Sequence, residues 1–176
     1  AILNLGYPGG PIIQKISEKG NANAIKFPRG LSNKNRGRWL YDYDKDLCFS
    51  FSGLKTSLLT HVKKTQTDNN NYEIKDIAAS FQQAIIDSLT NRMENSLNKF
   101  NVKSFSCAGG VSLNKPLRDS LNELSKKRNI PLLLSPPALC TDNAAMIAGV
   151  AYEMLNNRYL NTPNDVSPSL RLQSWF

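Results

Sequence analysis

The sequence predicts an α/β layer fold in one domain, and three observations support this. In the second half of the chain, short buried strands at 102–107 and 131–134 alternate with helices at 112–128 and 142–156. Strands and helices that alternate in this way are typical of α/β layer folds. The 176 residues are enough to bury a core, and 40% hydrophobic with 20% charged residues is ordinary for a globular protein.

The first half is predicted to be mainly helical. Pro11 suits the first position of a short helix that ends near Gly20, and a polar loop follows over 21–46. A loop this long in a compact domain is usually functional or mobile. A short strand is predicted at 47–51 and a helix from 53 to about 64. A long helix over 73–99 has one apolar side, formed at helical spacing by Ile77, Phe81, Ala84, Ile85, Leu89 and Met93.

The chain is basic, with a formal net charge of +8. Five cations crowd one short stretch of the polar loop: Lys26, Arg29, Lys34, Arg36 and Arg38. A charge of this sign favours an anionic partner such as nucleic acid or a nucleotide. The same stretch is equally explained as a solvated basic loop, and both interpretations stay open.

Three features bear on where the protein works. No run of 18 apolar residues occurs, so no membrane-spanning segment is expected. The start, Ala1 to Gly6, lacks the pattern of a signal peptide and is interpreted as a cut or processed end inside a longer sequence. The cysteines Cys48, Cys107 and Cys140 are odd in number and far apart, which favours buried free thiols in a reducing compartment. We therefore expect a cytoplasmic protein.

Two glycine pairs precede predicted helices and are candidates for ligand binding. In SCAGGVSLN, residues 106–114, Gly109 and Gly110 would let a ligand approach the backbone at a helix start, where phosphate is favoured. Asn114 would then reach a hydroxyl or a base edge. The second pair, in YPGGP at 7–11, includes Gly10. Each loop is also explained as a plain turn, but together the two would hold one ligand from opposite sides.

Asp142 begins the last predicted helix, in LCTDNAAMIAG at 139–149. As a helix cap its side chain would accept backbone N–H groups, which is worth about 1 kcal/mol. As a metal ligand it would need companions, and transition-metal sites normally include nitrogen or sulfur donors. The one histidine of the chain, His61, lies beside two lysines, which predicts a surface position. These residues alone therefore build no complete metal site.

Several motifs, in their order along the chain, resemble one protein family closely. They are YPGGP at 7–11, KFPR at 26–29, FSFSGLKT at 49–56, IAASFQ at 77–82, GGVSLNKPLR at 109–118 and LCTDNAAMIA at 139–148. Taken together they cover nearly the whole chain and resemble the bacterial TsaD (Gcp) family, the tRNA N6-adenosine threonylcarbamoyltransferases.

The resemblance implies a two-lobed, actin-like ATPase fold (ASKHA, ribonuclease H-like), of which this chain would be the C-terminal half. The lobe would span 1–162, including the basic loop at about 21–46, and a loosely ordered tail would span 163–176; the N-terminal lobe would be absent. The implied reaction transfers threonylcarbamoyl from threonylcarbamoyl-AMP to N6 of the adenosine 3′ of the anticodon, in tRNAs that read ANN codons.

The resemblance also implies roles for single residues. Gly10 and Asn114, with Gly109 and Gly110, would contact the nucleotide-like intermediate. At position 14, where relatives often carry an acidic residue, Gln14 would still hydrogen-bond a ribose hydroxyl. Asp142 would bind one divalent metal ion, Fe²⁺, whose other ligands, a pair of histidines among them, would lie outside this chain.

The implied partners are tRNA, threonylcarbamoyl-AMP and other tRNA threonylcarbamoylation proteins of the TsaB and TsaE type, with no membrane involved. No catalytic residue is identified, and the isolated chain is expected to be inactive. Two alternatives remain. One is an actin-like small-molecule kinase, against which LCTDNAAMIA argues. The other is a non-catalytic lobe or assembly module, which the missing histidines favour for the isolated chain.

Overall fold

The computed structural model describes residues 2–3, 5–30, 44, 46–67 and 73–156. They belong to two compact units, Ala1–Cys140 and Thr141–Phe176. Most of the predicted basic loop, the predicted boundary at 162 and the predicted tail lie outside the described residues. Among the helices that the structure describes, none is both long and apolar enough to cross a membrane.

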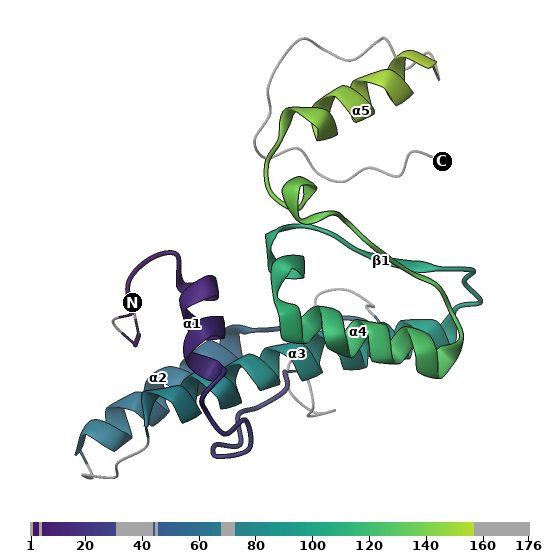
Figure 1. Cartoon of the computed structure of the whole chain (residues 1–176). Helices are drawn as coiled ribbons and strands as arrows, with labels where there is room; N and C mark the ends of the chain where they lie inside the picture. The colour runs from purple at the N-terminus through teal and green to yellow at the C-terminus, as the bar shows by residue number, and fades with distance from the viewer. Residues whose placement is uncertain (1, 4, 31–43, 45, 68–72, 157–176) are drawn as a thin grey trace. The chain divides into compact units, whose positions relative to one another are not determined.

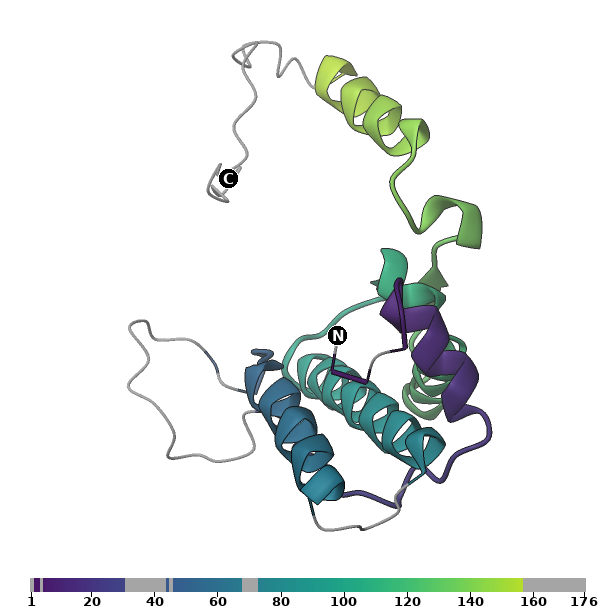
Figure 2. The ribbon, with the colours of Figure 1, turned by 90° about the vertical axis from the view of Figure 1, so that its left-hand side faces the viewer.

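The first unit is built around α3 (Ile74–Lys99), the long helix that the apolar spacing predicts. Asp76 lies in its first turn and Lys99 in its last, and both charges suit the helix dipole. Three other helices pack along α3 (Figures 1 and 2): α1 (Gly9–Ser17), α2 (Ser52–Thr67) and α4 (Lys115–Arg128). The predicted helices at 53–64, 73–99 and 112–128 are therefore confirmed, with shifted ends.

Two apolar clusters lie along α3. The first joins α3 to α2 and to the loop after α1, and it consists of Phe27, Leu54, Leu58, Ile77, Phe81 and Ala84. In this cluster the ring of Phe27 packs edge-on against Phe81, with the centroids 6.0 Å apart. The second joins α3 to β1 and α4, and it consists of Ile86, Phe105, Leu117 and Leu121. Burying each of the leucine, isoleucine and phenylalanine side chains contributes roughly 1.5–3 kcal/mol, so packing on both clusters stabilises α3.

The two strands, β1 (Phe105–Cys107) and β2 (Leu132–Leu134), form a parallel sheet. The register pairs Phe105 with Leu132, Ser106 with Leu133 and Cys107 with Leu134. Parallel strands need a crossover, and here it runs through the 3₁₀ turn η1 (Gly110–Leu113) and α4. Asn129, in the left-handed conformation with φ 53°, ends α4 and returns the chain toward β2. The prediction of a mixed α/β fold is confirmed.

Two predictions about the region between α1 and α3 are wrong. Residues 47–51 form no strand: Phe51 packs on the first cluster, and the segment pairs with no described strand. His61 is half-buried rather than on the surface, because α2 turns its ring edge-on to Phe27, with the centroids 5.8 Å apart. The three cysteines are free thiols, as predicted, but only Cys140 is fully buried.

The second unit contains one described helix, α5 (Ala144–Asn156). Its apolar side chains are largely exposed, including Met146, Ile147, Val150 and Leu155. The predicted helix at 142–156 is confirmed except for its first two residues.

Gly20 lies where the chain leaving α1 passes close to α3. A Cβ atom added at Gly20 would lie 2.0 Å from the backbone oxygen of Lys75 and 2.9 Å from Cβ of Ala79. We expect Gly20→Ala to lower the free energy of unfolding by about 2–3 kcal/mol, because α1 and α3 would have to separate. Urea denaturation followed by circular dichroism measures this change.

Gly53→Ala is the matched control, since no atom lies within 4 Å of a Cβ added there, inside α2. This variant should be neutral or stabilising by up to about 1 kcal/mol. Equal changes in the two variants would contradict the proposed close approach.

Candidate functional site

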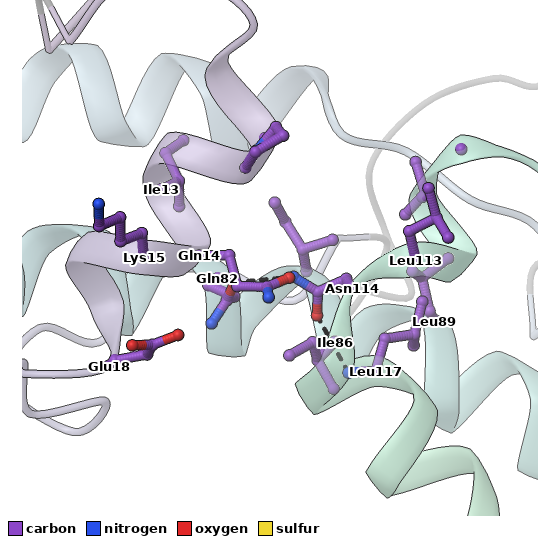
Figure 3. A pocket seen from close by; sticks show the side chains of 15 residues that line it. Ile13, Gln14, Lys15, Glu18, Gln82, Ile86, Leu89, Leu113, Asn114 and Leu117 are labelled. Atoms are coloured by element: carbon purple, nitrogen blue, oxygen red, sulfur yellow. Dashed lines mark hydrogen bonds between the residues drawn. The ribbon is translucent and has the colours of Figure 1, made fainter. Parts of the chain in front are cut away.

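A cavity of about 700 Å³ lies in the first unit, between α1, α3, η1 and the start of α4 (Figure 3). Apolar side chains form most of its wall, among them Ile13, Ile85, Ile86, Leu89, Val111 and Leu113. Ile85 and Leu89, which the apolar spacing assigns to the buried side of α3, thus line the cavity. The cavity also brings together four of the predicted site residues, Gly10, Gln14, Gly110 and Asn114.

Both glycine loops border this cavity. Gly10 lies in the first turn of α1, and Gly110 is the first residue of η1. A Cβ atom added at either position meets no protein atom within 4 Å, so the absence of a side chain leaves open space there. Gly109 does not line the cavity, but its φ of 85° is a conformation that favours glycine. The two loops thus border one cavity, although Gly10 and Gly110 are 100 residues apart in the sequence.

Asn114 holds the loop after β1 to the helices around the cavity. Its Oδ1 accepts the backbone N–H of Leu117 at 3.0 Å, which makes Asn114 the N-cap of α4. The prediction that Ser112 begins this helix is wrong, because the 3₁₀ turn η1 comes first. The Nδ2 group of Asn114 donates to Oε1 of Gln14 at 3.0 Å and to Oε1 of Gln82 at 2.9 Å. Both Nδ2 protons of Asn114 thus bind protein groups.

Gln82, on α3, is a cavity residue that the sequence analysis missed. Its Nε2 donates to Oγ of Ser17 at 2.7 Å, and that buried hydroxyl donates to the backbone oxygen of Gln14 at 2.7 Å. The signal in the sequence is slight: Gln82 is a polar residue directly after the buried run 77–81 of α3. We call Gln14, Ser17, Gln82 and Asn114 the amide network.

Arg118, on α4, ties the second glycine loop to the end of β2. Its Nε donates to the backbone oxygen of Ser112 at 2.5 Å, and its Nη2 donates to the backbone oxygen of Ser135 at 2.9 Å. The buried sulfur of Cys140 accepts Oγ–H of Ser112 at 3.2 Å. Three segments are therefore joined at one point: η1, the residues after β2, and the start of LCTDNAAMIA.

The thiol closest to the second glycine loop in sequence is Cys107, at the end of β1. Partial burial raises the pKa of this thiol; the charge of Arg118 opposes the shift, and Cys140 adds to it. A raised pKa keeps the thiol protonated at neutral pH, and a protonated thiol is a poor nucleophile. Cys107 also packs against the second apolar cluster, which gives it a packing role at the end of the strand.

Asp142 belongs to the second unit and is exposed. The prediction that Asp142 caps the last helix is wrong, because Asn143 directly precedes α5 and its Oδ1 accepts the backbone N–H of Met146 at 3.0 Å. Within the part of the chain that the structure describes, no three His, Cys, Asp or Glu residues lie close enough together to hold a metal ion. The described residues thus do not form a metal centre by themselves.

The family sequence model described as "TsaD: tRNA N6-adenosine threonylcarbamoyltransferase" matches residues 1–149. The chain belongs to this family. A tRNA N6-adenosine threonylcarbamoyltransferase of Clostridium novyi (strain NT) is 41% identical over 172 residues, which are 97% of this chain and 48% of that protein. One of Syntrophus aciditrophicus (strain SB) is 38% identical over 179 residues, which are 97% of this chain and 49% of that protein.

The resemblance seen in the motifs is thus confirmed as TsaD family membership. The matched region includes both glycine loops, the amide network and Asp142. The chain spans about half the length of the curated TsaD relatives that it matches. The ligand-binding roles of Gly10, Gln14, Gly109, Gly110 and Asn114, and the metal-binding role of Asp142, stay predictions.

Asn114→Asp separates helix capping from the amide network. Aspartate caps helices as well as asparagine does, so a residue that only caps would tolerate this change. In the network, however, a carboxylate oxygen would face the two Oε1 atoms of Gln14 and Gln82 without a proton between them. We expect the free energy of unfolding at pH 7 to fall by about 1–3 kcal/mol, measured by urea denaturation. An unchanged free energy of unfolding would show that Asn114 acts only as a helix cap.

Proposed function

We propose that the protein to which this chain belongs transfers a threonylcarbamoyl group from threonylcarbamoyl-AMP to N6 of the adenosine 3′ of the anticodon, in tRNAs that read ANN codons. The observation that carries the proposal is the cavity on which the two glycine loops converge, in a chain of the TsaD family. The cavity would hold the AMP part of the donor.

The geometry suits a nucleotide. The start of α1 has no side-chain cap, so its first backbone N–H groups, beside Gly10, remain available to a phosphate. The apolar wall formed by residues such as Ile85 and Leu89 suits the face of a base. In the transfer, the N6 amine forms a bond to the carbamoyl carbon and loses a proton. The bond from that carbon to the phosphate oxygen breaks, and AMP leaves. Holding AMP in the cavity would place this bond for attack.

The proposal includes the actin-like C-terminal lobe that the family resemblance implies, and one metal ligand. Asp142 would give a single carboxylate to an Fe²⁺ centre, whose other ligands lie outside the described residues. Since these residues do not form the centre, no step of the reaction is assigned to the metal. TsaB-type and TsaE-type proteins are the proposed protein partners.

The test compares this chain with a form extended to the full length of its relatives. Each is incubated with threonylcarbamoyl-AMP and unmodified tRNA, with and without the partner proteins, and the modified nucleoside is measured by mass spectrometry. We expect product only with the extended form. ATP turnover with a small-molecule acceptor, and no modified tRNA, would instead indicate a kinase. No activity of any extended form would indicate an assembly module.

We also propose that part of the basic stretch contacts tRNA phosphates. Arg29 is held by Asp87, with Nη2 and Oδ2 2.9 Å apart, and it also donates to the backbone oxygen of Phe27. Lys26 is exposed and forms no ion pair with any described residue, whereas Lys34, Arg36 and Arg38 lie outside the described residues. Arg29 therefore has a structural role. Of the two cations of the stretch that the structure describes, Lys26 is the one available to a phosphate.

We expect Lys26→Glu in the extended protein to weaken tRNA binding and to make the negative slope of log K against log salt less steep by about one. Filter binding at several salt concentrations measures both. Lys126→Glu, an equal charge change at an exposed position near the end of α4, is the control. Equal effects of the two variants would show a general charge effect and contradict a contact at Lys26.

A further inference from the structure

The loop that follows α1 contains no helix or strand over residues 21–29, yet side chains of α3 hold it at both ends. We call these residues the anchored loop. At its start, Oδ1 of Asp76 accepts the backbone N–H of Asn21 at 2.8 Å. At its end, Nε of Arg29 donates to Oδ2 of Asp87 at 2.9 Å. Binding residues are often found on loops that a rigid scaffold positions in this way.

Ser80 holds the middle of the anchored loop. This serine of α3 is completely buried, and its Oγ donates to the backbone oxygen of Asn21 at 3.1 Å. The same Oγ accepts the backbone N–H of Ile25 at 3.1 Å. One hydroxyl therefore joins two points of the loop to each other and to α3. The shape of the loop depends on a side chain that no ligand at the surface can touch.

The anchored loop forms an open hollow of about 660 Å³, a size within the range of roughly 300–1,000 Å³ that is usual for ligand pockets. Pro28 gives the lining exposed apolar surface. The side chains of Asn23 and Lys26 are exposed and bond to no described residue. Arg29 also lines the hollow, but Asp87 balances its charge. The lining thus offers one free amide and one positive charge without a described partner.

These two groups match one nucleotide of an RNA strand. Each phosphodiester carries one negative charge, and an amide both donates and accepts hydrogen bonds, as base edges and 2′-hydroxyl groups do. We propose that the hollow of the anchored loop binds one nucleotide of tRNA, with Lys26 at the phosphate and Asn23 at the base or ribose. Ser80 is a positioning residue, which acts through the loop. The inference rests on the proposed function, in which tRNA is the substrate.

Asn23→Ala in the extended protein tests the contact at the surface. The side chain is exposed, so its loss leaves the fold intact. We expect the affinity for tRNA, measured by filter binding, to fall about three- to tenfold. The slope of log K against log salt should not change, because no charge is removed. Asn122→Ala removes an exposed amide from α4 and is the control, with an expected change of less than about twofold.

Ser80→Ala tests the positioning role, since it removes the two hydrogen bonds to the loop and leaves every exposed group in place. We expect the affinity for tRNA to fall about fivefold or more, and the backbone amides of the anchored loop to exchange their hydrogens faster. Ser88→Ala is the matched control. Ser88 is also buried on α3, but its Oγ donates within the helix, to the backbone oxygen of Ala84 at 2.6 Å.

An affinity of Asn23→Ala within twofold of the parent value, or equal losses in Ser80→Ala and Ser88→Ala, would overturn the inference and leave the proposed function standing. Weaker binding of the partner proteins with unchanged binding of tRNA would also overturn it, because the hollow would then bind protein. If the extended parent binds no tRNA, with or without the partner proteins, the proposed function fails, and the inference fails with it.

Discussion

The side chain of Asn114 is the contact on which the site depends. With one oxygen and two N–H groups it starts α4, reaches α1 through Gln14 and reaches α3 through Gln82. A partly buried polar group that binds three separate segments is costly to leave unsatisfied, so the three helices must adopt one arrangement to satisfy it. The apolar clusters on α3 supply the stability, and Asn114 selects the geometry of the cavity.

The second glycine loop is constrained from both of its ends. At its start, the φ of 85° at Gly109 turns the chain out of β1 in a way that favours glycine. At its end, Arg118 holds the backbone oxygen of Ser112 and also the residues after β2. Gly110 lies between these two restrained points, and its backbone is exposed at the cavity. A ligand would thus meet a loop that is already in place, which lowers the ordering cost of binding.

The sequence predicted the features that depend on local periodicity, and the rest depends on distant partners. The spacing of apolar residues was enough for α3, and the alternation of elements was enough to predict a mixed α/β fold with two strands. The aromatic segment at 47–51 resembles a strand but has no partner strand among the described residues. Two predicted helix starts differ from the observed ones because serine, aspartate and asparagine are all good N-caps. Only the folded structure shows that Asn114 and Asn143 are the capping residues. Gln82 was missed because its partners lie 65 and 32 residues away.

The parallel pair has only three residues in each strand, and this brevity has a consequence for the behaviour of the chain in solution. Within the described residues, β1 and β2 pair only with each other, so each has an outer edge without a partner strand. Leu133, in the middle of β2, is 60% exposed. An open edge beside an exposed leucine is a template for strand addition, either by another segment of the whole protein or by a second molecule. The chain in isolation should therefore associate more readily as its concentration rises.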